Sequence, residues 1–123
     1  MEWTHSGYTL CGGSIYNENV IISAAHCCKV FEMPETGIKD FRIVAGNLKS
    51  ASISDGTEQY RYINDYLIHP DFDEATLLND ICLVYLEEPL NFASEFVQPI
   101  NITKDEPVQG PCQISGWGTE VLR

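Results

Sequence analysis

Apolar residues along the chain fall into short runs separated by polar turns, a pattern typical of β-structure. Six runs have this character, and most are bounded by Gly, Pro, Asn or Asp. They are residues 9–16, 20–23, 41–45, 59–63, 66–68 and 81–86. A short helical turn is expected at 24–27, directly after the second run. Six short strands favour a small closed antiparallel barrel, which leaves no sheet edge exposed, although periodicity alone does not separate a barrel from a sandwich.

Two further stretches lack any regular pattern. Residues 46–56 are predicted to form a surface loop. Residues 99–111 read as a linker, because their prolines and glycine interrupt any regular element and a fully polar Lys-Asp-Glu run follows the first proline.

Composition narrows the class of protein. The chain has 123 residues, of which 44% are hydrophobic and 11% aromatic, and this supports one folded domain rather than disorder. The formal charge of -11 and the scattered Lys and Arg residues argue against nucleic acid as a partner. No apolar run approaches the roughly 18 residues needed to cross a bilayer, so no membrane span is predicted.

Two separated motifs carry candidate chemistry. His26 stands in Ser23-Ala24-Ala25-His26-Cys27, directly after an apolar strand, where an imidazole could serve as a general base. Asp80 opens the apolar run 81–86, where its carboxylate could fix the tautomer of a neighbouring ring. Their spacing of 80 − 26 = 54 residues means that only the fold can bring the two side chains together.

Four stretches resemble the trypsin-like and chymotrypsin-like serine endopeptidases. CGGSIY, SAAHC, NDICLVYL and CQISGWG stand in the order of that family, and the likeness covers nearly the whole chain. The resemblance implies peptide-bond hydrolysis by a Ser-His-Asp triad, with His26 as the catalytic general base and Asp80 as its orienting carboxylate. The sequence contains no Gly-Asp-Ser-Gly-Gly segment, so the nucleophilic serine has no candidate in it.

The resemblance also implies how the chain is organised. Residues 1–98 would form an all-β, antiparallel six-stranded Greek-key barrel, 99–111 the linker and 112–123 the first strand of a truncated second barrel. The chain would then be the N-terminal portion of a secreted, extracellular enzyme whose true beginning is missing. Its implied partners are protein or peptide substrates and protease inhibitors, and no cofactor is implied.

Five cysteines in a short chain indicate an oxidising compartment, and the odd count leaves at least one without an internal partner. The resemblance pairs Cys11 with Cys27 and places the partner of Cys112 in the second barrel. Cys82, on an apolar strand, is most simply a buried core thiol. Cys28 stays open between a free, a mispaired and an intermolecular thiol.

Competing chemistries for these side chains are weaker. Zinc is disfavoured because paired Cys-x-x-Cys or His-x-x-x-His spacings are missing and the adjacent Cys27 and Cys28 do not easily turn to one ion. A cysteine nucleophile is disfavoured because Cys27 follows His26 directly, and consecutive side chains do not face each other. Ser14 and Ser115 are expected to be strand serines rather than nucleophiles.

Two weaker sites complete the prediction. Asn47, Asp55 and Glu58 lie in or beside a loop that holds calcium in some members of the resembling family, but the few oxygen atoms here favour a solvated loop and no metal. Asn101-Ile102-Thr103 fits the N-glycosylation acceptor pattern in the expected linker.

An alternative function is a non-catalytic protease homologue that acts as a binding module. The presence of both His26 and Asp80 counts against it, because a module that only binds has no chemical need of the pair. On either interpretation the chain alone is expected to be inactive, since in the resembling family the nucleophile, the oxyanion hole and the specificity pocket come from the second barrel.

Overall fold

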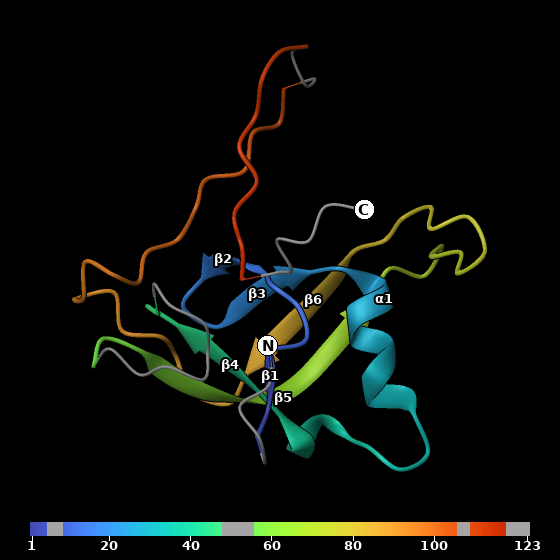
Figure 1. Ribbon diagram of the computed structural model, residues 1–123, viewed down its shortest axis with the longest axis horizontal. Coiled ribbons are helices and arrows are strands. Elements are labelled where there is room, and N and C mark those ends of the chain that lie inside the picture. Colours follow the sequence, from blue (N-terminus) through green and yellow to red (C-terminus); the bar gives the residue numbers. More distant parts are fainter. Residues whose placement is uncertain (5–8, 48–55, 106–108, 118–123) are drawn as a thin grey trace.

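The fold is a six-stranded antiparallel sheet that curls into a half-barrel (Figure 1). The structure is a computed structural model, and it describes residues 1–4, 9–47, 56–105 and 109–117. The strands are β1 (Glu2–Trp3), β2 (Ser14–Asn17), β3 (Val20–Ser23), β4 (Phe41–Ala45), β5 (Gln59–Ile68) and β6 (Cys82–Leu86). Their order in the sheet is β1-β4-β5-β6-β3-β2. The predicted all-β antiparallel architecture is confirmed.

The described residues also form three single-turn helices between the strands. They are α1 (Ala25–Cys28), η1 (Lys29–Glu32) and η2 (Ile38–Asp40). The helix α1 directly follows β3 and lies at one end of the sheet, next to β5 and β6 (Figure 1). The predicted helical turn at 24–27 therefore forms one residue later than expected.

The core lies on the concave side of the curled sheet and is built by strict alternation of burial. On β4 and on β6 every second residue is buried, as expected for strands with one face toward a core. The buried cluster combines these positions with side chains from β3, β5, the helical turns after β3 and the segment after β6. Its largest members are Ile21, Phe31, Phe41, Ile43, Ile63, Leu86 and Leu90.

The predicted strands 59–63 and 66–68 are one strand. β5 pairs with β4 through Gln59–Tyr62 and with β6 through Ile63–Ile68. The register against β6 shifts between Ile63 and Asp65, so one extra residue stands between the paired positions. Such a bulge bends a strand and increases its twist. The polar Asn64-Asp65 step therefore marks a bend within one strand rather than a turn between two.

The N-terminal end of the sheet also differs from the prediction. The expected strand 9–16 is formed only from Ser14 onward, and Thr9 makes an isolated bridge to Glu2. The two-residue strand β1, which pairs with β4, was not predicted. A two-residue strand is too short for an alternation pattern, so the sequence gives no local signal for it.

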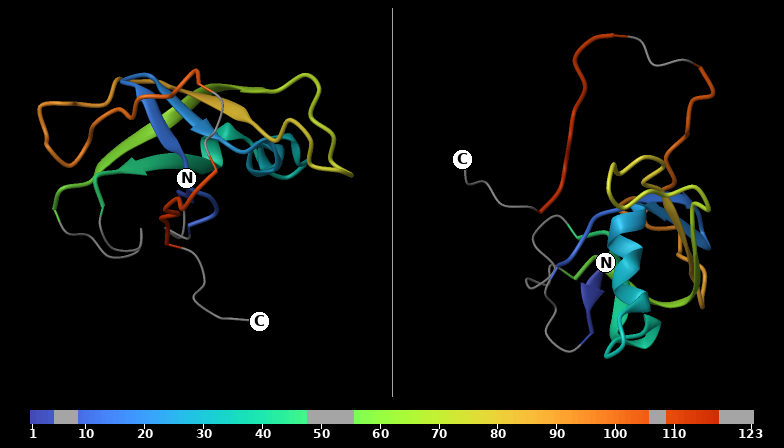
Figure 2. Two further views of the ribbon diagram at one scale, coloured as in Figure 1. Left: turned by 90° about the horizontal axis from the view of Figure 1, so that it is seen from above. Right: turned by 90° about the vertical axis from the view of Figure 1, so that its right-hand side faces the viewer.

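Residues 99–105 and 109–117 contain no strand. The orange segment rises away from the sheet and the red segment runs back toward it (Figures 1 and 2), so that Trp117 lines a hollow together with Gly12, Gly13 and Gly46. The strand expected at 112–123 is not formed over 112–117, and 118–123 lie outside the described residues. A strand needs a neighbouring strand to satisfy its backbone groups, and the strand pairings among the described residues do not include 112–117. The boundaries at 98 and 111 stay predictions. None of the helices in the described ranges has the length and apolar character to span a bilayer.

Candidate active site

Strand register brings His26 and Asp80 together. Ser23, the last residue of β3, pairs with Cys82, the first residue of β6. His26 follows Ser23 by three residues, and Asp80 precedes Cys82 by two. The end of one strand and the start of its neighbour thus place both side chains at the same end of the sheet, although 54 residues separate them.

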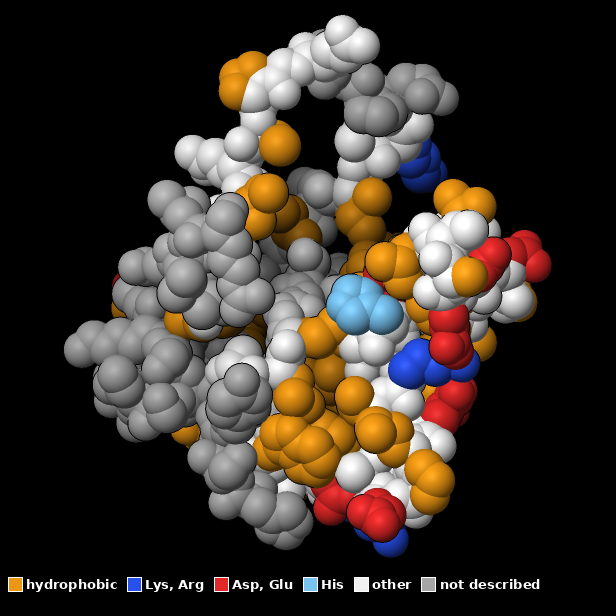
Figure 3. Space-filling view, turned by 45° about the vertical axis from the view of Figure 1, so that its right-hand side comes forward, with side chains coloured by type: hydrophobic (Ala, Val, Ile, Leu, Met, Phe, Trp, Pro, Cys, Tyr) orange, Lys and Arg blue, Asp and Glu red, His pale blue; other side chains and the backbone are white. Residues whose placement is uncertain are grey.

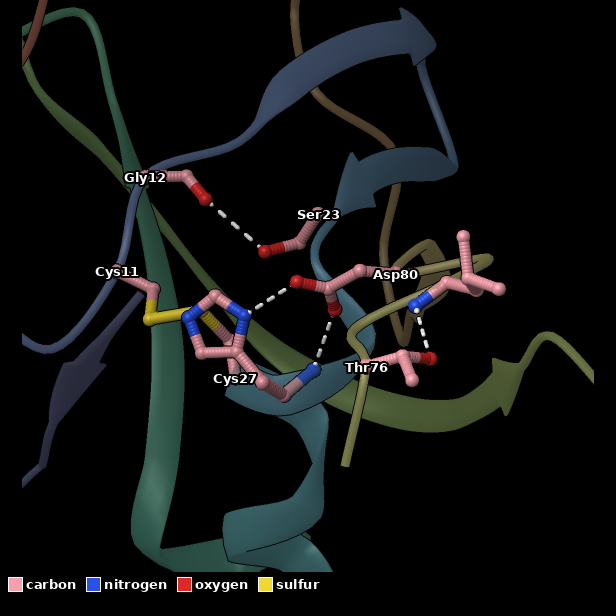
Figure 4. Close-up of polar contacts among 8 residues, drawn as sticks. Cys11, Gly12, Ser23, Cys27, Thr76 and Asp80 are labelled. Atoms are coloured by element: carbon pink, nitrogen blue, oxygen red, sulfur yellow. Dashed lines mark hydrogen bonds and ion pairs between the residues drawn. A yellow bond between two sulfur atoms is a disulfide. The ribbon is translucent and has the colours of Figure 1, made fainter. Parts of the chain in front are cut away.

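Asp80 holds His26 through both carboxylate oxygens (Figure 4). Oδ2 lies 2.6 Å from Nδ1 of the ring, and Oδ1 accepts a 2.8 Å hydrogen bond from the backbone N–H of His26. Ala24, at the N-cap of α1, makes no side-chain capping bond. The Asp80 carboxylate therefore takes the place of a capping side chain, and one group orients both the first turn of the helix and the imidazole.

These contacts keep Asp80 ionised. The backbone N–H of His26 is the main cause that lowers the pKa of Asp80, and the ring of His26 adds to it. A carboxylate accepts but does not donate, so the proton of the neutral ring lies on Nδ1 and the lone pair on Nε2. The site thus presents an imidazole nitrogen that can accept a proton.

The imidazole is open to solvent. The His26 side chain is 57% exposed, whereas that of Asp80 is 21% exposed. Nε2 lies 3.6 Å from Sγ of Cys27, and that sulfur is bonded to Cys11. Figure 3 shows a histidine side chain near the centre of this face with hydrophobic side chains beside it. A bound chain could reach such a nitrogen.

The loop before Asp80 is held by local hydrogen bonds. Leu77 and Asn79 both have positive φ, 60° and 57°. Asn tolerates this region better than most residues, and its Nδ2 donates to the carbonyl of Asp71 at 3.0 Å. The backbone N–H of Ile81 donates to the carbonyl of Asn79 at 2.8 Å. These bonds fix the direction in which the chain enters β6 and so the direction of the Asp80 side chain.

Two disulfides flank the pair. One disulfide joins Cys11 to Cys27, and a second joins Cys28 to Cys82. The second bond corrects the expectation that Cys82 is a core thiol, and it gives Cys28 a partner. Both residues are buried, and the pairing of β3 with β6 brings them together. Cys112 is exposed and forms no disulfide within the described part of the chain.

The sequence carries no local signal for the second disulfide. Cys28 and Cys82 are 54 residues apart, the same separation as His26 and Asp80, but equal separation does not bring two pairs together where the strands are antiparallel. The helical turn α1 after β3 is what brings Cys28 to Cys82. The resemblance alone did not predict it.

The remaining candidate residues lie apart from the pair. Ser14 in β2 and Ser115 in the C-terminal segment are exposed, and neither contacts His26 within the described ranges. One group of potential metal ligands occurs among the described residues, Cys11, His26 and Cys27. Its sulfur atoms form the disulfide, so they offer no thiolate.

The loop and linker sites are only partly described. Asn47 is buried, and Glu58 accepts a 3.4 Å hydrogen bond from the hydroxyl of Tyr60. Asp55 lies outside the described residues. Asn101 is exposed, and its glycosylation stays a prediction.

Comparison with known proteins assigns the family. The chain matches the Trypsin family over residues 1–122. It is 35% identical over 115 residues to Trypsin-1 of Salmo salar, covering 93% of this chain and 43% of that protein. It is 36% identical over 113 residues to Trypsin-1 of Astacus astacus, covering 91% and 46%. It is 34% identical over 115 residues to Inactive serine protease scarface of Drosophila melanogaster, covering 92% and 17%. The chain belongs to the trypsin family.

The chain spans less than half the length of these relatives. The part that it covers contains the six-stranded sheet and the His26–Asp80 pair. The family assignment agrees with the resemblance seen in the sequence motifs.

Proposed function

We propose that this chain supplies the general base and the orienting carboxylate of a serine endopeptidase that hydrolyses peptide bonds. The observation that supports the proposal best is the His26–Asp80 pair, in which one carboxylate accepts hydrogen bonds from the ring Nδ1 and from the backbone N–H of His26, while the imidazole stays open to solvent. A carboxylate–imidazole pair with this geometry is suited to take a proton from a hydroxyl and to stabilise the imidazolium that results.

The chemistry would proceed in two halves. Nε2 of His26 would take the proton of a serine hydroxyl as that oxygen attacks the scissile carbonyl, and would deliver it to the leaving amine as the peptide bond breaks, which leaves an acyl-serine. The same nitrogen would then take a proton from a water that attacks the ester, and would return it to the serine oxygen as the acid product leaves. Asp80 would stay ionised throughout, in keeping with its lowered pKa. The sequence of 123 residues has no Gly-Asp-Ser-Gly-Gly segment, so the attacking serine would come from outside it. Protein or peptide substrates and protease inhibitors are the partners that follow.

Location and modification follow from the same proposal. Two disulfides in a chain of this size are typical of proteins that fold in an oxidising compartment, which supports secretion. Asn101 is exposed in an irregular segment, where an N-glycan could be attached in that compartment.

A second candidate is a non-catalytic homologue that acts by binding. The relative from Drosophila melanogaster whose name describes it as inactive favours this alternative. It predicts the same fold and the same disulfides, so the fold does not separate the two candidates. They differ in whether a serine is ever activated by His26.

The test is covalent labelling of the native protein. We would isolate it from its source, measure its intact mass, and treat it with a biotinylated fluorophosphonate, which reacts with activated serines. Labelling of a product longer than 123 residues, abolished by His26→Ala, is expected for the endopeptidase. The 123-residue chain should not be labelled and should not hydrolyse casein. A native product that carries a serine segment yet remains unlabelled would contradict the enzyme and favour the binding homologue.

A further inference from the structure

Two bonds of different kinds join the same two segments of the chain. Hydrogen bonds connect His26 with Asp80, and a disulfide connects Cys28 with Cys82. In both cases the partners are 54 residues apart. The disulfide lies two residues beyond His26 on α1 and two residues beyond Asp80 on β6. We propose that Cys28 and Cys82 are positioning residues for the His26–Asp80 pair. The catalytic meaning of this inference rests on the function proposed above.

The helix α1 needs an external support. It has four residues, and isolated helices of this length are not stable in water. Its N-cap residue Ala24 contributes no side-chain hydrogen bond, and the carboxylate of Asp80 bonds to its first turn instead. A shift of β6 relative to α1 would therefore move the capping bond and the ring bond at once. A covalent link between α1 and β6 resists such a shift.

Among the described residues, no other covalent link joins these two segments. The neighbouring Cys27 is bonded to Cys11, which precedes β2, so that disulfide ties α1 to a different part of the sheet. Lys29 also reaches the loop before Asp80, through a 3.1 Å ion pair with Glu74. Both of its groups are substantially exposed, and surface ion pairs of this kind hold geometry weakly.

Burial makes the Cys28–Cys82 link rigid. Cys28 has no exposed surface and Cys82 is 1% exposed, and both belong to the core cluster. The hydrogen-bonded pair lies at the surface, where water competes for the ring and the carboxylate. The disulfide closes the 54-residue loop in advance, so the hydrogen bonds do not have to oppose the chain entropy of closing it. A general base is effective only when its geometry is held closely.

The experiment follows the proton on Nδ1 of His26 by NMR. In the 123-residue chain, a low-field Nδ1–H resonance is expected, with slow exchange with water because Asp80 holds the proton. In Cys28→Ala/Cys82→Ala we expect that exchange to become at least tenfold faster, or the resonance to be lost. Leu86→Ala is the matched control. It removes a buried side chain from the same strand without cutting the link, and should leave the resonance unchanged.

Each outcome decides the matter. An unchanged exchange rate in the folded double variant would overturn the positioning role and leave the proposed function untouched. Absence of the resonance in the unaltered chain would overturn the pair, and with it both proposals. If the double alanine variant does not fold, Cys28→Ala/Cys82→Val restores apolar volume without the bond. Failure of both variants to fold, while Leu86→Ala folds, would assign the disulfide to stability alone and overturn the inference.

Discussion

The barrel and the C-terminal segment, residues 109–117, differ in how much of their apolar surface they bury and in whether they form strands. Within the barrel, strands alternate buried and exposed positions, and the core joins side chains from β3, β4, β5 and β6. In the segment 109–117, the described residues form no strand and Ile114 is 95% exposed. An isoleucine in this environment contributes nothing to the fold of the chain as it stands.

The difference shows where the site gets its order. His26 and Asp80 both belong to the barrel, and every contact that fixes them comes from it. The pair is therefore assembled without help from the C-terminal segment. The exposed side chain of Ile114 in that segment is in turn available to a partner surface.

The largest expected loss in the free energy of unfolding comes from truncating a side chain in the core of the barrel. Phe41 is fully buried on β4, and its ring contacts those of Trp3 and Phe31 at 4.4 and 5.2 Å between centroids. Phe41→Ala should lower the free energy of unfolding by about 3–5 kcal/mol, because it removes transfer energy and leaves a cavity. Urea denaturation followed by fluorescence measures the change.

The control for that variant lies in the other region. Ile114→Ala also removes apolar atoms, but they are already in water, so the free energy of unfolding should change by no more than about 0.5 kcal/mol. A loss at position 114 comparable with that at Phe41 would mean that the C-terminal segment packs on the barrel, and the contrast between the two regions would disappear.

Much of the barrel could be predicted from the sequence because alternation is a local signal. β3 and β4 were placed at their observed bounds, and β6 within one residue. β5 was divided in two because a bulge inserts polar residues into a strand that continues past them. A bulge is defined by the partner strand, and the partner is not visible in a local pattern.

The site shows the same division between local and long-range information. Motifs around His26 and Asp80 nominated both residues, and the structure brings them into contact. The Cys28–Cys82 bond was missed because it depends on the register of β3 against β6. Register follows from the hydrophobic pattern of two strands together, not of either one alone.

An intermediate effect on the free energy of unfolding is expected at the loop that follows β4. Gly46 has φ of +81°, and a Cβ there would lie 2.6 Å from the carbonyl oxygen of Thr57 and 2.9 Å from Cγ2 of Val97. Gly46→Ala should cost about 2 kcal/mol or more, since the left-handed conformation alone costs an L-residue about 1–2 kcal/mol. Thermal or urea unfolding measures the loss.

Gly12 is the matched control for this backbone test. A Cβ at Gly12 meets nothing within 4 Å, so Gly12→Ala should be neutral or stabilise by about 0.4–1 kcal/mol through the unfolded chain. Equal losses at Gly12 and Gly46 would show that close approach of the backbone does not explain either glycine.

The smallest change in stability should come from the His26–Asp80 pair, because it lies at the surface of the barrel. In the folded chain, hydrogen bonds from His26 lower the pKa of Asp80 below its ordinary value of about 3.9. Asp80 therefore contributes stability that is fully present above that value and is lost as the pH falls through the folded pKa. Asp80→Asn lacks this contribution, so its stability should fall below that of the unaltered chain at neutral pH and approach it in acid. Urea midpoints measured between pH 7 and pH 2 test the sign.

The control is Glu95→Gln, at an exposed position, whose urea midpoint should follow that of the unaltered chain over the whole pH range. If the urea midpoint of Asp80→Asn differed from that of the unaltered chain by the same amount at every pH, the carboxylate would act through its shape rather than its charge. The hydrogen bonds that orient His26 would then not contribute to the stability of the barrel.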